Sequence, residues 1–152
     1  MFESFAKKAL GKKINTLFRL SMMNFRNEMK KLGVGPGDYA FIALLFVRQG
    51  LSQDELSRQM RVDKSYTARA LAKLEKLGMV ERRPDPDEHR IKRVFLGQKA
   101  RDIETDMFRI VKNWHTALGK GIEPDRMEMI RAGMDQMIAN AETYLGLDES
   151  LK

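Results

Sequence analysis

The stretch VDKSYTARALAKLEKLGMVERR, residues 62–83, constrains the fold more than any other part of the chain. At about 100° per residue, the step of an α-helix, it separates into two faces. The apolar face carries Thr67, Ala70, Leu71 and Leu74. The opposite face is polar and cationic, without an acid, and carries Ser65, Tyr66, Arg69, Lys73 and Lys76. Because solvated helix faces usually mix both signs of charge, this pattern predicts a helix with one face in the core and the other on a polyanion.

A second, shorter helix is predicted just before this one. Ser52 and Glu55 have the spacing of a capping box, which predicts a helix over residues 53–60. Asp63 then has the place of an N-cap for the basic helix, and Gly78 that of its C-terminal residue. Two helices joined by so short a turn, the second with a basic outer face, are typical of a helix-turn-helix.

A hairpin is predicted directly after the basic helix. Residues 79–83 and 91–96 read as two antiparallel strands, and PDPDEHR at 84–90 reads as a charged, turn-rich tip. A hairpin in this place makes the helix-turn-helix a winged one. The expected fold is therefore mostly α with a small β-hairpin wing, in the α+β class.

Helices are also expected on both sides of this core. Apolar residues recur at three- and four-residue steps over 3–31, 98–119 and 124–145, whereas 38–48 is apolar almost all round and reads as a buried helix. The amphipathic terminal helices need a surface to bury against, and we expect a second copy of the chain to supply it. The predicted organisation is a winged helix-turn-helix DNA-binding domain at 33–97, flanked by dimerisation helices at 1–32 and 98–152.

Composition narrows the partners and the location. The 152 residues carry a net charge of +7, with a pI of about 9.7, which indicates a polyanionic partner. The excess is concentrated in residues 1–31 and 58–93, which hold 8 and 11 basic residues against 2 and 6 acidic ones. There is no cysteine, so disulfide scaffolds, thiolate metal sites and cysteine-based redox sensing are excluded. With no membrane-length apolar run and no secretory signal pattern, we expect a cytoplasmic protein without membrane contact.

Little in the sequence supports catalysis. His89 and His115 are far apart, and the chain has neither a glycine-rich phosphate loop nor an H-E-x-x-H pattern. We therefore expect no enzyme activity, no metal and no cofactor.

The residues from 51 to 96, LSQDELSRQMRVDKSYTARALAKLEKLGMVERRPDPDEHRIKRVFL, resemble the MarR/SlyA family of winged-helix transcription regulators. The resemblance covers about a third of the chain. The family's recognition helix ends in L-E-x-x-G-(hydrophobic)-V-x-R, here Leu74, Glu75, Gly78, Met79, Val80 and Arg82. An Asp-Pro-rich wing follows in both. Asp87 and Glu88 depart from the family's usual Arg and Asp, and Leu96, Gly97 and Ala100 depart from its usual Leu-Thr and glycine. These changes bear on how the wing binds DNA rather than on the fold.

The helix-turn-helix pattern assigns roles within the DNA-binding surface. The start of a recognition helix meets base edges, so we expect Ser65, Tyr66 and Arg69 there, with a solvated face on which Tyr66 packs against a neighbour as the alternative. Contacts to phosphates are expected from Lys64, Lys73 and Lys76. In the wing, Arg90 is expected in the minor groove, with His89 and Lys92 near the backbone. Arg82 and Arg83 are either phosphate contacts or exposed strand residues. The acids Asp85, Asp87 and Glu88 would repel phosphate unless they pin the arginines.

The resemblance also implies a small-molecule effector. Family relatives bind aromatic acids and other small anionic or phenolic compounds between the dimerisation helices and the winged domain. The corresponding contributors here are Arg19, Tyr39, Trp114 and His115, each equally explained as a packing or surface residue. Lys8, Lys12 and Lys13, together with Lys7, are either the rim of such a pocket or a second surface for phosphates.

The function expected from the sequence is a homodimeric regulator, a repressor, that binds a pseudo-palindromic operator in double-stranded DNA and is released by a small anionic or phenolic effector. Two alternatives remain open at this point. A non-specific architectural protein would bind every DNA sequence with similar affinity, and a protein-interaction module would pack its basic face on another protein.

Overall fold

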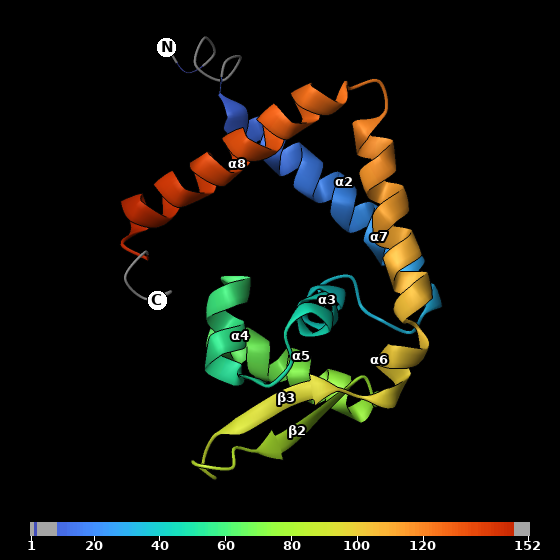
Figure 1. Ribbon diagram of the computed structural model, residues 1–152, viewed down its shortest axis with the longest axis vertical. Helices are drawn as coiled ribbons and strands as arrows, with labels where there is room; N and C mark the ends of the chain where they lie inside the picture. The colour runs from blue at the N-terminus through green and yellow to red at the C-terminus, as the bar shows by residue number, and fades with distance from the viewer. Residues whose placement is uncertain (1, 3–8, 148–152) are drawn as a thin grey trace.

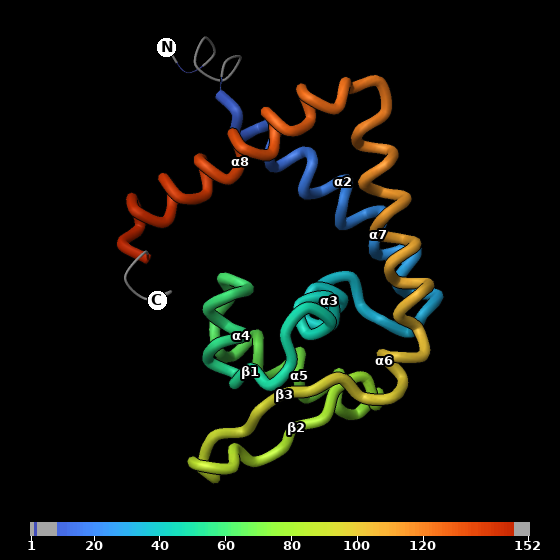
Figure 2. The backbone as a smooth tube through the Cα atoms, in the orientation of Figure 1, coloured from blue at the N-terminus to red at the C-terminus, as the bar shows by residue number. Residues whose placement is uncertain are grey.

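Three long helices form an arch over one side of the molecule in the computed structural model, which describes residues 2 and 9–147 (Figure 1). They are α2 (Leu10–Lys31), α7 (Glu104–Gly119) and α8 (Pro124–Leu145). α7 packs against α2, where the indole Nε1 of Trp114 donates to Ser21 Oγ at 3.1 Å. α8 then crosses α2 in the views of Figures 1 and 2, and its C-terminal end returns toward α4.

The lobe beneath the arch holds the shorter elements. Its helices are α3 (Tyr39–Val47), α4 (Gln53–Met60), α5 (Lys64–Lys76) and α6 (Gln98–Asp102). Its strands are β1 (Leu51–Ser52), β2 (Val80–Pro84) and β3 (Lys92–Leu96), which form one antiparallel sheet in the order β1-β3-β2. The mostly helical fold with a small hairpin is confirmed.

The core lies between α3, α5 and the sheet. Phe41, Ile42 and Leu45 of α3 are completely buried, as expected for a helix that is apolar almost all round. From α5, Leu71 and Leu74 enter the same cluster, which the strands complete with Val80 and Val94 among others. The apolar face predicted for residues 64–76 is therefore the face that anchors α5, and its polar face is left outward.

Three local predictions differ from the structure. The predicted helix 3–31 is not continuous in the described part: α2 begins at Leu10, because Ala9 is extended (φ −69°, ψ 130°), and residues 3–8 lie outside the described part. β1 was not predicted, since two residues are too short for a strand pattern, yet Leu51 pairs with Val94. The predicted helix 98–119 is broken at Ile103 (φ −100°, ψ 3°) into α6 and α7. Ala100 and Met107 are both buried, and their spacing of seven residues would also place them on one face of a continuous helix. The periodicity of apolar residues therefore does not reveal the break.

The arch helices leave their apolar stripes open. None of the 22 residues of α8, all within the described part of the chain, is buried. Its stripe includes Ile130, Met134 and Ile138, which are 41%, 44% and 47% exposed. On α2, the apolar side chains of four residues are exposed in the same way: Leu10, Ile14, Leu17 and Phe18. No helix among the described residues is both long enough and apolar enough to cross a membrane.

Candidate nucleic-acid interface

Local capping fixes where α4 and α5 begin. The Ser52 hydroxyl accepts from the backbone N–H of Glu55 at 3.2 Å, and the Glu55 carboxylate accepts from the N–H of Ser52 at 2.7 Å, so the predicted capping box is complete. The Asp63 carboxylate accepts from the N–H of Tyr66 at 2.7 Å, which confirms Asp63 as the N-cap of α5. Because Asp63 stops α5 from beginning earlier, Ser65 and Arg69 fall in its first two turns.

A buried hydroxyl pair joins the two helices. Ser57 of α4 donates to Thr67 of α5 at 2.9 Å, and both residues are buried. The turn between the helices passes through Arg61, which adopts the left-handed conformation (φ 53°) and forms an ion pair with Glu142 of α8. The angle between α4 and α5 is thus set by buried contacts and not by the turn alone.

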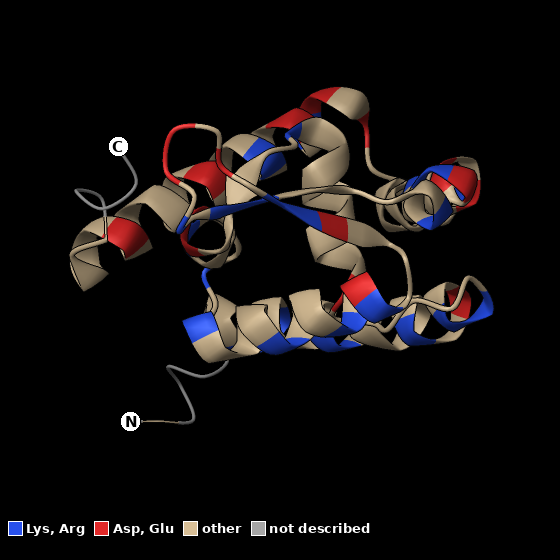
Figure 3. Ribbon diagram, turned by 90° about the horizontal axis from the view of Figure 1, so that it is seen from below, with Lys and Arg blue, Asp and Glu red and all other residues tan. Residues whose placement is uncertain are grey.

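The outward face of α5 is cationic, as predicted. Lys64, Ser65, Arg69 and Lys76 are all exposed. Figure 3 shows Lys and Arg recurring along the helix, in which Glu75 is the only acid. Arg82 of β2 forms an ion pair with Glu75, and this hydrogen bond lowers the pKa of the Glu75 carboxyl. Glu75 therefore remains ionised but neutralised by its partner, and the face keeps its positive sign.

Several predicted contact residues already have a partner within the molecule. Lys64 binds Asp54 at 2.8 Å, and Lys73 binds Asp38 at 2.6 Å. Tyr66 packs its ring 6.2 Å from that of Phe41, as in the alternative considered for it. Arg83 binds Glu81 at 2.9 Å and lies over the Phe95 ring at 4.9 Å.

A smaller group of predicted residues has no such partner. Within residues 2 and 9–147, no hydrogen bond or ion pair engages the side chain of Arg69, Lys76, His89, Arg90 or Lys92, and all five residues are exposed. These five side chains lie on α5 and on the wing. They are the cations and the imidazole that an external anion can reach without displacing a bond.

The wing is a hairpin that is tied to the helix-turn-helix where its strands meet its tip. β2 and β3 pair from Val80 opposite Leu96 to Pro84 opposite Lys92, and residues 85–91 form the tip (Figure 2). Asp85 is the first residue of the tip, and its Oδ1 accepts from the N–H groups of Asp87 and Glu88 at 2.9 and 3.0 Å. These bonds shape the tip and leave Arg90 exposed on it.

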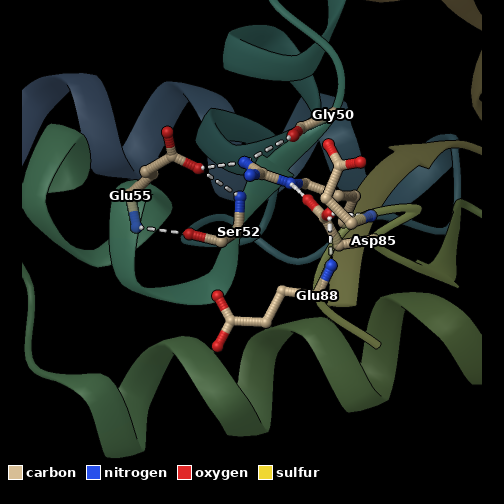
Figure 4. A network of polar contacts seen from close by, with 7 residues as sticks. Gly50, Ser52, Glu55, Asp85 and Glu88 are labelled. Atoms are coloured by element: carbon tan, nitrogen blue, oxygen red, sulfur yellow. Dashed lines mark hydrogen bonds and ion pairs between the residues drawn. The ribbon is translucent and has the colours of Figure 1, made fainter. Parts of the chain in front are cut away.

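Arg93 is the central residue at this end of the wing, and no motif in the sequence indicates its role. Its guanidinium donates to Asp85 at 2.6 Å, to Glu55 at 2.8 Å and to the carbonyl of Gly50 at 3.3 Å (Figure 4). The bond from Arg93 is the main cause that lowers the pKa of Asp85. One acid of the wing, Asp85, thus binds an arginine, but that arginine is Arg93 and not Arg90 at the tip. No local pattern in the sequence marks Arg93, because its three partners come from separate segments of the chain.

The residues considered for an effector are only partly brought together. Tyr39 and Trp114 both pack on Phe25, with ring centroids 4.5 and 6.3 Å away, and burial raises the pKa of the Tyr39 phenol. Arg19 and His115 are exposed. Arg19 lies two residues before Ser21, about 200° round α2, so it leaves the helix on another side from the one that meets Trp114. Lys12 and Lys13 are exposed on α2, and Lys8 lies outside the described residues.

Comparison with known proteins supports one family. The MarR family model matches residues 36–92. A MarR transcriptional regulator from Methanosarcina mazei Go1 superposes with a TM-score of 0.83 and 30% identity, over 89% of this chain and 97% of that one. The uncharacterised HTH-type transcriptional regulator YybA of Bacillus subtilis (strain 168) is 26% identical, over 76% of this chain and 77% of its own length.

A third similar protein was solved with DNA. It is a mutant MarR from E. coli complexed with operator DNA, which superposes with a TM-score of 0.78 over 88% of this chain and 96% of that one. Its sequence is 20% identical to this chain, so the likeness concerns the fold.

Proposed function

The chain belongs to the MarR family of transcription regulators, and we propose that it represses transcription by binding a pseudo-palindromic operator in double-stranded DNA as a homodimer. The observation that carries the proposal is the outward face of α5. Ser65 and Arg69 lie exposed in its first two turns, where a recognition helix meets base edges. The relatives are transcription regulators rather than enzymes, and one similar fold was solved on operator DNA.

Within this surface we assign base reading to Ser65 and Arg69. An arginine guanidinium can fork onto the O6 and N7 acceptors of guanine, and the serine hydroxyl suits several bases. Lys76, Lys92 and His89 supply charge or hydrogen bonds to phosphates, and Arg90 reaches the minor groove from the wing tip. Asp87 and Glu88 share that tip and weaken its attraction for DNA, which leaves most of the affinity to α5.

The open stripes of α2 and α8 support the homodimer. A helix of 22 residues without a buried side chain has too little contact with its own chain to be held by packing. Pairing two copies through residues 1–32 and 98–152 would cover these stripes. A two-fold dimer of this kind would set two α5 helices on successive major grooves, which is why the proposed operator is a pseudo-palindrome.

We also propose an effector, an aromatic acid or another small anionic or phenolic compound. The rings of Phe25, Tyr39 and Trp114 gather where α2 and α7 meet α3, between the arch and the lobe. The chain has a single tryptophan, so quenching of its fluorescence by benzoate reports binding at this place. Benzoate that quenches Trp114 and also releases the DNA supports the proposal. Quenching without release, or neither effect, contradicts it.

The test of the proposed function is selection of bound duplexes from a random DNA pool, at near-physiological salt. Recovery of one pseudo-palindromic sequence by a dimer is the expected result. Unbiased DNA would favour a non-specific architectural protein. No DNA at all, from a folded dimer, would favour a protein-interaction module.

A further inference from the structure

The turn between α2 and α3 contacts the recognition helix α5 at two points. Gly37 lies against the Tyr66 hydroxyl, and Asp38 forms an ion pair with Lys73. Tyr66 and Lys73 are seven residues apart, so they lie on one side of α5, two helical turns from each other. At a rise of about 1.5 Å per residue, the two contacts of this turn with α5 are about 10 Å apart along the helix axis.

The contact at Gly37 leaves no room for a side chain. A Cβ at this position would lie 2.4 Å from Tyr66 Oη, while the next atom, Tyr66 Cζ, is 3.8 Å away. The Tyr66 ring is itself packed beside the buried ring of Phe41. A residue larger than glycine must therefore displace Tyr66, and with it the start of α5 or the direction in which the hydroxyl points.

The contact at Asp38 uses a carboxylate that would otherwise serve α3. Asp38 is the N-cap of α3, yet its side chain makes no capping hydrogen bond. Its Oδ2 instead accepts from Lys73 Nζ at 2.6 Å, and the residue is 7% exposed. Since N-cap carboxylates normally bind the first backbone N–H groups of their own helix, this side chain is committed to α5.

We propose that Gly37 and Asp38 are positioning residues for DNA recognition. They fix the rotation of α5 by holding Tyr66 and Lys73 against the protein, so that Ser65 and Arg69 are the side chains presented to base edges. This inference rests on the proposed function. It departs from the roles first expected for Tyr66 and Lys73, because it makes them supports of the helix and not contacts to DNA.

The first test is a double-mutant cycle of Gly37 and Tyr66 in the whole chain. The probe is the DNA duplex that the wild-type chain selects from a random pool. Gly37→Ala should weaken binding of this duplex by about tenfold or more, the size of one misplaced base-reading side chain. Tyr66→Phe should bind like the wild type. The double variant should also recover, because without the hydroxyl the added methyl meets only Cζ at an ordinary distance. Gly133→Ala, at a helical glycine with nothing within 4 Å of its Cβ position, is the matched control.

The second test uses salt dependence. If Lys73 is held by Asp38, Lys73→Gln should leave the slope of log K against log salt unchanged, whereas Lys76→Gln should reduce it by about 0.9 for each phosphate that the lysine neutralises. Asp38→Asn should release Lys73 to the DNA and make the slope steeper by a similar amount.

Two results would overturn the positioning role. Tyr66→Phe that binds as poorly as Gly37→Ala, with no recovery in the double variant, would make the Tyr66 hydroxyl a direct DNA contact. A reduced slope for Lys73→Gln would make Lys73 a phosphate contact. Failure of the proposed function gives a different result, because the wild-type protein itself then selects no duplex. In that case the positioning role is contradicted too.

Discussion

Arg93 on β3 donates through Nε to the carboxylate of Asp85, 2.6 Å away where the strands of the wing meet its tip. The same guanidinium reaches Glu55 in the first turn of α4, so one side chain connects the wing to the helix-turn-helix. These charge-assisted hydrogen bonds hold the hairpin against α4 at the end next to its tip. The orientation of the wing therefore depends on the ionisation of Asp85.

This bond predicts a pH dependence of stability. Arg93 lowers the pKa of Asp85 below its ordinary value of 3.8, so the ionised carboxylate stabilises the fold fully above that value. The stabilisation is lost as the pH falls below 3.8 and through the lowered pKa. Asp85→Asn should thus lower the Tm at neutral pH, and the gap from the wild type should close on acidification.

Thermal unfolding of both proteins between neutral pH and strong acid checks this. Asp87→Asn is the matched control, because it removes a carboxylate of the same loop that is exposed and makes no hydrogen bond or ion pair in the described chain. A gap between wild type and Asp85→Asn that persists unchanged in acid would contradict the role given to the ionised Asp85.

The buried hydroxyls of Ser57 and Thr67 should act as a pair. Ser57→Ala and Thr67→Val should each cost about 1 kcal/mol of the free energy of unfolding, the usual net value of a hydrogen bond. The double variant should cost less than the two single changes together, because both remove the same 2.9 Å bond. Urea unfolding measures all three. Thr116→Val, which removes only an exposed bond to Lys112, should stay within about 0.5 kcal/mol of the wild type. Strictly additive costs would show that the two hydroxyls are not coupled.

The proposed dimer predicts that a charge on the open stripe of α8 separates the protomers. Met134→Glu should convert the protein to monomers in sedimentation velocity at micromolar concentration, because a buried unpaired carboxylate at an interface is costly. Gln136→Glu adds the same charge about 200° away round the helix and should leave a dimer. A dimer that survives Met134→Glu, or a wild-type monomer, would contradict pairing through this face.

The helix-turn-helix was predictable because its signals are local. The capping box at Ser52, the N-cap at Asp63 and the two faces of α5 depend on residues within a few positions of each other, and the structure has all three as predicted. The helix over 53–60 has the predicted bounds, and each strand of the wing is within one residue of them. The resemblance of residues 51–96 to the MarR/SlyA family then identified the fold as a whole.

What was missed depends on contacts between distant segments. Arg93 meets Gly50, Glu55 and Asp85, which are up to 43 residues away in the chain. Lys73 meets Asp38 across 35 residues, and no pattern in residues 62–83 distinguishes it from Lys76, for which no partner is seen among the described residues. Tyr66 was placed on the outer face by its helical angle alone, yet its ring bends back to Phe41. The angle of a residue on a helix is local, whereas the partner of its side chain is not.

The most direct measurement of the central claim compares the wild type with Arg69→Ala on two duplexes, the selected operator and a version with its bases permuted, at fixed salt. We expect Arg69→Ala to remain folded and dimeric and to lose about 1–3 kcal/mol of discrimination between the duplexes. Lys76→Ala should weaken both duplexes alike. If Arg69→Ala discriminates as well as the wild type does, the outer face of α5 does not read the DNA sequence through Arg69.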